Sequence, residues 1–289
     1  ITHVIRGDDH VNNTPRQILL YEALGFTPPV FAHLSMVMGP DHTPLSKRHG
    51  ATSVAEFRAR GYLPEALVNY LALLGWSPGD DQEIMSLEDM ARRFDLRHVS
   101  HSAAVFDVAK LSWLNRQYMK AAEPSRVAVL AHPYFERAGY VTAATPDAQA
   151  FIEQVLPMAI GSVDRLEEIP ARVAFLFDWR APQAAALTRQ EADGLKAVAA
   201  FADVVDGPLL DRDAFRAAAT KVRERTGLKG KALFHPLRVA LTGLESGPEL
   251  DLAVPAIDRA AALPDGSGVS RVASCAARAR AVAAACEGV

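Results

Sequence analysis

The chain has few cysteines, no long apolar run and no large excess of charge, and each absence excludes a class of protein. Its two cysteines, Cys275 and Cys286, lie in an alanine-rich stretch without neighbouring histidines. They therefore predict reduced thiols, and neither a metal site nor a disulfide framework is expected. No apolar run reaches the roughly 20 residues of a membrane helix. The net charge of −3 argues against indiscriminate nucleic-acid binding but allows a local basic face.

The start of the chain lacks both a methionine and the pattern of a signal peptide. Ile1 opens the stretch ITHVIRG, which already has the composition of a strand, and no charged start is followed by an apolar run. We therefore expect a fragment of a longer cytoplasmic protein. The 289 residues are 49% apolar and 22% charged, which predicts about two folded domains and little disorder.

The first 50 residues have the pattern of an α/β unit. The runs THVIR and FAHLSMVMG favour strands. The segment between them, NTPRQILLYEALG, favours a helix with Thr14 as its cap, Pro15 in its first turn and Gly25 at its end. Strand, helix and strand in this order predict one βαβ unit of a parallel sheet.

Beyond residue 50 the signals are almost all helical. Ser53, with Glu56 three residues later, forms a capping-box pattern. From residue 123 alanine is frequent, β-branched runs are scarce, and proline or glycine separates one helical segment from the next, including a segment over 170–179. The sequence therefore predicts a mixed fold in three parts, residues 1–50, 51–122 and 123–289, the last of them all-α.

The stretch HVIRGDDH, residues 3–10, places Arg6 at the carboxyl end of the first predicted strand, followed by Asp8, Asp9 and His10. Ligands of open α/β sheets bind outside the carboxyl ends of the strands. A guanidinium at that edge suits a carboxylate, because its fork matches two oxygens. The alternative is an Arg–Asp ion pair that only shapes the turn.

The stretch PLSKRHG, residues 44–50, is a basic loop that follows the second predicted strand. Lys47 and Arg48 on such a loop can stabilise the phosphates of a polyphosphate, with Ser46 as a further hydroxyl donor. The alternative is a solvated basic loop. No glycine-rich phosphate loop of the Walker type occurs in the sequence.

A third basic stretch, residues 221–238, reads KVRERTGLKGKALFHPLR. Its glycines at 227 and 230 predict a helix, a loop and a second helix. The cations can contact a phosphate backbone, or they can form an ordinary solvated helix face. They are Lys221, Arg223, Arg225, Lys229, Lys231 and Arg238.

Taken together, these stretches resemble the glutamyl-tRNA synthetases of the bacterial type, which are class I aminoacyl-tRNA synthetases. The resemblance is carried by THVIRGDDHVNNTPRQILLYEALGF, FAHLSMVMGPDHTPLSKRHGATSV, GYLPEALVNYLALLGWSPGD and VFDVAKLSWLN, in order and spacing, and by GLKGKALFHPLRVALTGLESGPEL near the end. It implies a remnant of an α/β Rossmann-type catalytic domain over 1–50, a helical stem-contact domain over 51–122 and an all-α anticodon-binding domain over 123–289.

The resemblance also implies a function, an aminoacyl-tRNA ligase that forms glutamyl-adenylate from glutamate and ATP with Mg²⁺ and transfers the glutamyl group to the 3′ end of tRNA(Glu). Lys47 would be the catalytic lysine of a KMSKS-type signature loop. Arg6 would hold the side-chain carboxylate of glutamate. Asp9 and His10 would lie near ATP or the tRNA end. No tightly bound metal is expected, and a monomer is the family's habit. ATP would contact Met36, Val37, Pro44, Leu45, Ser46, Lys47 and Arg48, and tRNA would contact the six cations of 221–238.

Several positions depart from the family pattern. Pro44 replaces the first lysine of the signature loop, Asp8 stands where glutamate is frequent, and the alanine-rich tail 251–289 is atypical. No HIGH-type motif occurs, since none of the nine histidines brackets a glycine in that way. We therefore expect that this chain alone does not form the adenylate. Two alternatives are a glutaminyl-type enzyme, which the all-α ending argues against, and a tRNA-binding module without catalysis.

Overall fold

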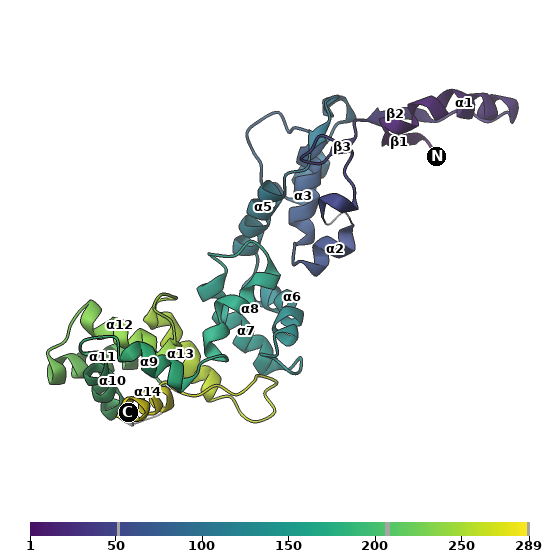
Figure 1. Cartoon of the computed structure of the whole chain (residues 1–289). Coiled ribbons are helices and arrows are strands. Elements are labelled where there is room, and N and C mark those ends of the chain that lie inside the picture. The colour runs from purple at the N-terminus through teal and green to yellow at the C-terminus, as the bar shows by residue number, and fades with distance from the viewer. Residues whose placement is uncertain (51–52, 206–208, 288–289) are drawn as a thin grey trace. The chain divides into compact units, whose positions relative to one another are not determined.

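The computed structural model describes residues 1–50, 53–205 and 209–287, without the side chains of Lys47 and Glu287. The chain divides into two compact units, Ile1–Ala121 and Ala122–Val289, each with its own internal packing (Figure 1). Within the described ranges no helix is long and apolar enough to cross a membrane. The finer division of the first unit at residue 50 stays a prediction.

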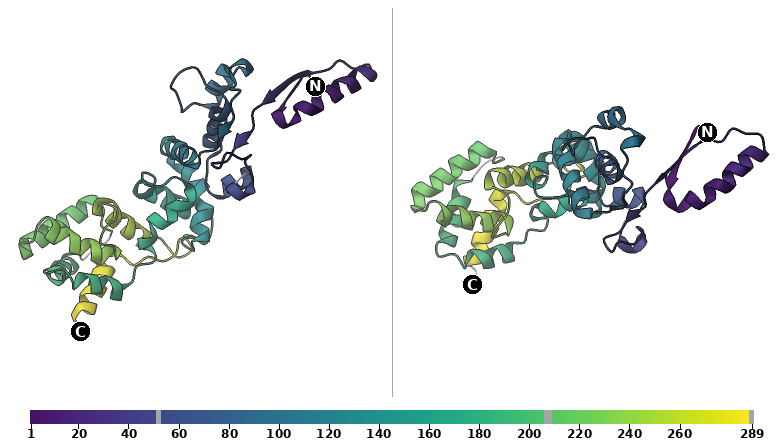
Figure 2. Two further views of the ribbon diagram at one scale, coloured as in Figure 1. Left: turned by 45° about the horizontal axis from the view of Figure 1, so that its top comes forward. Right: turned by 90° about the horizontal axis from the view of Figure 1, so that it is seen from above.

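The first unit opens with the predicted strand, helix and parallel strand. Strand β1 (His3–Gly7) leads through a 3₁₀ turn, η1 (Asp8–Asn13), into helix α1 (Thr14–Ala23) and then strand β2 (Val30–Leu34). The strands pair in parallel, from His3 opposite Val30 to Gly7 opposite Leu34, and Figure 2 shows α1 running alongside them. Asn13, not Thr14, occupies the N-cap position of α1, and Gly25 follows the helix with a φ of 72°.

The second predicted strand divides into two strands that belong to different sheets. Residues Val37–Met38 form β3, which pairs in parallel with β4 (Ala104–Val105). The amide of Phe106 donates to the carbonyl of Met38 at 2.8 Å. Strand β4 had no signal in the sequence, because a two-residue strand is defined by a distant partner and not by its own pattern.

Helices pack around two hydrophobic clusters in the rest of the first unit, a larger aromatic core and a smaller cluster of Trp76, Met85 and Met90. They are α2 (Val54–Ala59), α3 (Pro64–Gly75), α4 (Leu87–Arg93) and α5 (Val108–Ala121), with the 3₁₀ turns η2 (Lys47–His49) and η3 (Leu96–His98). The core contains Phe57, Tyr62, Leu67, Tyr70, Phe106, Leu111 and Leu114. The predicted capping box is confirmed, since the Ser53 hydroxyl accepts from the amide of Glu56 and the Glu56 carboxylate accepts from that of Ser53.

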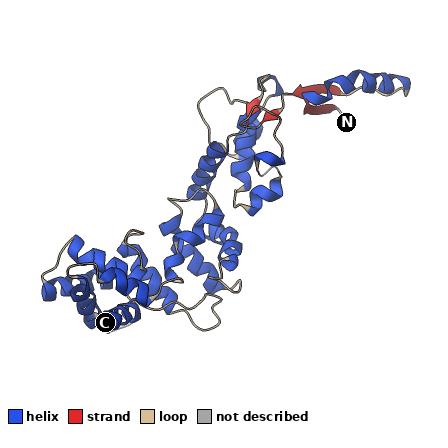
Figure 3. Cartoon of the chain, in the orientation of Figure 1, coloured by secondary structure: helices blue, strands red, loops and turns tan. Residues whose placement is uncertain are grey.

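The second unit is built from helices, and the strand elements that Figure 3 colours red all belong to the first unit. Its α-helices are α6 (Pro124–Arg137), α7 (Pro146–Ala159), α8 (Ile169–Arg172), α9 (Ala181–Thr188), α10 (Gly194–Val204), α11 (Arg212–Thr226), α12 (Lys231–Thr242), α13 (Leu250–Ala261) and α14 (Cys275–Glu287), with 3₁₀ turns η4 (Leu166–Glu168) and η5 (Ala174–Leu176). The single helix predicted over 170–179 is wrong, because α8 ends at Arg172 and η5 is a separate turn. The helix is interrupted at Val173, and Phe175 and Leu176 in the following turn are buried in the core.

The atypical tail forms the last two helices, and buried polar groups hold them in place. Arg278 on α14 is 1% exposed. Its guanidinium donates to the carbonyls of Phe175 at 3.0 Å and Leu241 at 2.7 Å, and lies 5.0 Å from the Trp179 ring. Asp258 on α13 accepts from the amide of Cys275 at 2.7 Å. The tail is therefore an integral part of this unit.

Candidate functional site

Arg6 is held at the carboxyl end of β1 by neutral partners. Its guanidinium donates to the hydroxyl of Thr14 at 2.9 Å and to the side-chain oxygen of Gln17 at 2.8 Å, both on α1. It also lies 5.4 Å from the ring of Phe31 on β2. No carboxylate pairs with Arg6 within residues 1–50, 53–205 and 209–287, so the Arg–Asp ion pair considered from the sequence is not formed. The guanidinium is fixed in direction, and its charge is uncompensated.

A cavity of about 240 Å³ lies beside Arg6, between the strand pair and α1. Gln17, Tyr21 and Phe31 line it together with Arg6, and the remaining walls are apolar. A cationic group at the edge of a small apolar cavity is suited to a small molecule with one carboxylate end.

The turn after β1 brings Asp9 close to Met36. A Cβ atom added to Gly7 would lie 2.5 Å from a carboxylate oxygen of Asp9 and 3.2 Å from the sulfur of Met36, so a larger residue at this position would displace the Asp9 side chain. His10 is exposed and lies 3.7 Å from the Asp9 carboxylate. Asp9 and Met36, which sequence reasoning placed in two separate stretches, therefore meet over one backbone position.

The signature loop, residues 44–48, is anchored to β3 at its base. The amide of Leu45 donates to the carbonyl of Val37 at 2.9 Å, and Pro44 forms a bridge with Met38. Val37 thus belongs to the frame of the loop. Ser46 is half-buried and Arg48 is exposed, and the side chain of Lys47 lies outside the part of the chain that the structure describes.

Two residues to which the sequence reasoning assigned no role, Asp41 and His49, connect the segments on either side of this loop. The His49 ring contacts the Asp41 carboxylate at 3.1 Å, and the Arg48 guanidinium lies 3.5 Å from the same carboxylate. The sequence contains both partners, because Asp41 precedes the basic pair Lys47–Arg48 in the chain and His49 follows it directly. Their proximity depends on a turn that spacing alone does not predict.

The basic run 221–238 forms the predicted helix, loop and helix, with Gly227 and Gly230 at positive φ. Within the described residues, none of its six assigned cations forms an ion pair, and five of them form no side-chain hydrogen bond either; these are Lys221, Arg223, Arg225, Lys229 and Lys231. The sixth, Arg238, donates to the carbonyl of Pro248 at 2.5 Å. Arg238 is therefore held by its own chain.

The structure divides four of these five cations, all except Lys231, between two faces. Arg223 and Lys229 line a cavity of about 300 Å³ that also includes Phe234, which is 42% exposed. Lys221 and Arg225 are exposed and do not line this cavity. An exposed aromatic ring beside two cations suits an unstacked nucleotide, since the ring can stack on the base while the cations meet phosphate.

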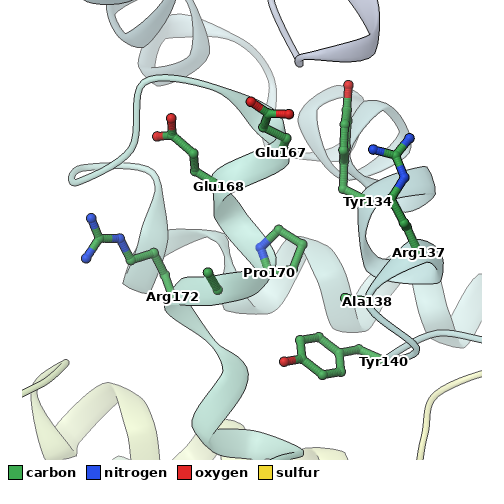
Figure 4. A pocket seen from close by; sticks show the side chains of 9 residues that line it. Tyr134, Arg137, Ala138, Tyr140, Glu167, Glu168, Pro170 and Arg172 are labelled. Atoms are coloured by element: carbon green, nitrogen blue, oxygen red, sulfur yellow. The ribbon is translucent and has the colours of Figure 1, made fainter.

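A larger cavity of about 700 Å³ in the second unit contains none of the residues assigned from the sequence. Figure 4 shows Tyr134 and Arg137 on one side, with Glu167, Glu168 and Arg172 across from them. The Glu168 carboxylate accepts from Arg165 at 2.6 Å, and Arg172 donates to the carbonyl of Ser162 at 3.1 Å. Cations and carboxylates both face the space, so it does not favour a ligand of one charge.

The part of the chain that the structure describes holds no cluster of side chains that could share a metal ion. Among the described residues, no group of three or more histidine, cysteine, aspartate or glutamate side chains lies close enough to hold an ion. Cys275 and Cys286 are not joined by a disulfide. Burial raises the pKa of the Cys275 thiol well above its usual range. The thiol of Cys275 is therefore held in its neutral, unreactive form.

Comparisons with known proteins match two segments of the chain, one in each of its two compact units. Residues 1–113 match the catalytic domain of class I tRNA synthetases (E and Q), and residues 126–263 match an anticodon binding domain. The glutamate–tRNA ligase of Desulforamulus reducens is 41% identical over 268 residues, which are 90% of this chain and 55% of that protein. The glutamate–tRNA ligase of Synechococcus sp. is 43% identical over 258 residues, which are 86% of this chain and 53% of that protein.

A solved structure supports the same assignment. The crystal structure of a glutamate tRNA ligase from Elizabethkingia meningosepticum, in complex with its amino acid, matches with a TM-score of 0.74 and 25% identity. The match covers 99% of this chain and 57% of that one. The chain thus spans about half the length of the curated relatives it matches.

Proposed function

Because this chain belongs to the class I tRNA synthetases for glutamate and glutamine, we propose that it supplies the signature loop, part of the glutamate site and the anticodon reader of a glutamate–tRNA ligase. The main support for this proposal is that a segment similar to the catalytic domain, residues 1–113, is followed by a segment similar to an anticodon binding domain, residues 126–263. The reaction is activation of glutamate by ATP to glutamyl-adenylate, with release of pyrophosphate. Transfer of the glutamyl group to the 3′ end of tRNA(Glu) follows.

Arg6 is the residue that we propose to bind the side-chain carboxylate of glutamate. Its guanidinium is oriented by Thr14 and Gln17, so little conformational entropy is lost when it meets the substrate. The uncompensated charge and the small cavity beside it support this assignment. Asp9 and His10, at the end of the same strand, are proposed to lie near ATP or the tRNA end.

The signature loop is proposed to bind the phosphates of ATP, which arrives as its Mg²⁺ complex. Lys47 stabilises the negative charge that develops as pyrophosphate leaves, and Ser46 and Arg48 add donors on either side of it in the chain. Such catalysis depends on donors that are in place before the reaction begins. Met36 and the backbone of Val37, with Pro44 and Leu45, are proposed to border the adenine and phosphate positions.

The second unit is proposed to read the anticodon of tRNA(Glu). Its exposed cations on α11, on α12 and in the loop between them support contact with an RNA backbone. The helical character of the unit favours glutamate over glutamine enzymes, since glutaminyl-type enzymes end in β-barrels. A cytoplasmic location and a monomeric state are part of the proposal.

Binding of the 289-residue chain to tRNA(Glu) tests the proposal. Affinity is measured with the natural and with altered anticodons across a series of salt concentrations. We expect binding that weakens roughly tenfold or more when the anticodon is altered, since each lost base contact costs about 1–3 kcal/mol. Weak binding that is indifferent to the anticodon contradicts the reading function.

A second measurement separates the ligase from a tRNA-binding module without catalysis. The isolated chain should give no ATP–pyrophosphate exchange, even with glutamate and tRNA present, because it contains no HIGH-type motif. A complete glutamate–tRNA ligase that carries this sequence should exchange. Exchange by the isolated chain contradicts the first expectation, and its absence from the complete protein favours the binding module.

A further inference from the structure

We propose that Asp41 and His49 form a pair of positioning residues that fixes the signature loop, residues 44–48, for its work on ATP. This inference rests on the proposed function of that loop. Neither residue is assigned a contact with a substrate, and both act through Ser46 and Arg48. The argument depends on three features: a buried histidine, a carboxylate that gathers several donors, and a glycine that admits the ring.

The His49 side chain links Asp41, which precedes the signature loop, to Ser46 within it. Its side chain is 8% exposed, and its Nε2 atom lies 3.1 Å from a carboxylate oxygen of Asp41. Its Nδ1 atom accepts a hydrogen bond from the amide of Ser46 at 3.0 Å. A ring protonated at Nε2 donates to Asp41 while Nδ1 accepts from Ser46. The Nε atom of Arg48 also lies 3.3 Å from Nε2.

Gly39 makes room for the ring. A Cβ atom added at this position would lie 2.9 Å from three atoms of the His49 ring, which is closer than carbon atoms approach without displacement. The amide of Gly39 also donates to the carbonyl of Thr43 at 2.7 Å. The turn that carries Asp41 and the segment that carries His49 are therefore packed directly against each other.

The Asp41 carboxylate contacts Thr43, which precedes the signature loop, as well as Arg48 and His49 at its end. Its carboxylate accepts from the hydroxyl of Thr43 at 2.7 Å and from the Thr43 amide at 3.1 Å. These bonds, assisted by His49, hold the pKa of the Asp41 carboxyl well below its usual range, so it is charged at neutral pH. The Arg48 guanidinium lies 3.5 Å from Asp41 and donates to the Thr43 hydroxyl at 2.5 Å.

The result is a closed arrangement in which Ser46 and Arg48 are each tied to the Asp41–His49 pair. Lys47 lies between these two residues in the chain, so its backbone position is set from both sides. Catalysis by electrostatic stabilisation is fastest when the charged groups need no rearrangement. A displacement of about 1 Å can cost roughly a hundredfold in rate. Loss of either member of the pair should therefore slow adenylate formation.

The test is made in a complete glutamate–tRNA ligase that carries this sequence. ATP–pyrophosphate exchange is measured for Asp41→Asn, His49→Ala and His49→Gln, with Lys47→Ala as a reference for loss of the loop's chemistry. The matched control is His42→Asn. His42 is an exposed histidine of the same turn with a φ of 57°, a backbone conformation that asparagine tolerates.

We expect Asp41→Asn and His49→Ala to lower the kcat of exchange roughly tenfold to a hundredfold. The KM for glutamate and the affinity for tRNA should stay within about twofold, because neither depends on this loop. His49→Gln should recover part of the rate, since its amide can still donate to Asp41. The control should exchange like the unchanged protein.

A measurement on the loop itself does not depend on ATP. The Ser46 amide should be protected from hydrogen exchange in the unchanged protein and lose protection in His49→Ala, with the melting temperature recorded for each variant. An unprotected Ser46 amide in the unchanged protein overturns the inference. The inference is also overturned if Asp41→Asn and His49→Ala catalyse ATP–pyrophosphate exchange as fast as the unchanged protein, or faster, while Lys47→Ala is slow. An unaffected Lys47→Ala variant instead overturns the proposed role of the loop in ATP chemistry.

Discussion

At the residue scale, Arg6 is a cation that neutral partners hold in a fixed direction. Two neutral acceptors on α1 orient the guanidinium, and an aromatic ring on β2 lies against it. None of these partners neutralises the charge. A cation that is held but not paired retains its full attraction for a carboxylate, and the fork of arginine adds direction that lysine lacks.

This arrangement predicts that Arg6→Ala, in a complete ligase carrying this sequence, raises the KM for glutamate in pyrophosphate exchange roughly tenfold or more. Charged hydrogen bonds contribute about 1.5–3 kcal/mol each. Arg6→Lys should recover only part of this loss. Arg16→Ala is the control, since Arg16 is an exposed arginine on α1. An unchanged glutamate requirement in Arg6→Ala would assign Arg6 to the turn alone.

At the element scale, the α11–loop–α12 segment shows that cations close in sequence can serve different faces. Arg223 and Lys229 line one cavity with Phe234, and Lys221 and Arg225 lie outside it. The helical period separates Arg223 from Lys221 and Arg225, because residues two apart on a helix point in different directions, and Lys229 lies in the loop after α11. Arg216, on the cavity side, already pairs with Asp251 at 2.5 Å, so Arg223 and Lys229 are the cations left for a ligand.

We therefore predict that Arg223→Ala with Lys229→Ala weakens binding of the chain to tRNA(Glu) more than Lys221→Ala with Arg225→Ala. Both double variants remove two positive charges, so a purely electrostatic contact affects them equally. Each phosphate contact that is lost should reduce the salt dependence of binding by about one unit of slope. Equal losses in the two variants would mean that the faces do not differ and the run acts only through its total charge.

At the scale of the whole molecule, a buried arginine holds the last helix of the second unit against earlier segments. The Arg278 guanidinium joins η5, α12 and the segment before α14 by donating to the carbonyls of Phe175, Leu241 and Ala273. Burial lowers the pKa of Arg278 to about 10, so it is still protonated at neutral pH. A cation in such a place stabilises only while all of its acceptors are present.

Replacement of Arg278 should therefore destabilise the second unit strongly. Arg278→Ala leaves several buried carbonyls without donors, and breaking a buried charge network costs about 3–5 kcal/mol. The effect should appear as a lower midpoint of denaturant unfolding. Arg271→Ala is the control, because the Arg271–Asp265 pair is exposed, and exposed pairs contribute about 0–1 kcal/mol. Similar midpoints for the two variants would contradict the structural role of Arg278.

The sequence by itself determined the parallel strand–helix–strand unit at the start, the capping box at Ser53 and the helical character of the second half. These features follow from local rules: hydrophobic period, proline and glycine at helix ends, and side chains that cap the nearest amides. The resemblance to glutamyl-tRNA synthetases came from ordered motifs in the same way, and the family assignment of residues 1–113 and 126–263 is confirmed.

Only the tertiary structure decided the pairing of β3 with β4, the placement of the tail by Arg278 and Asp258, and the closure of the signature loop by Asp41 and His49. Each depends on groups that are distant in sequence or on the direction in which a turn points a side chain. The buried partners of Arg278 are carbonyl groups, which every residue possesses. Side-chain identity therefore carries no signal for them, and the fold alone brings them together.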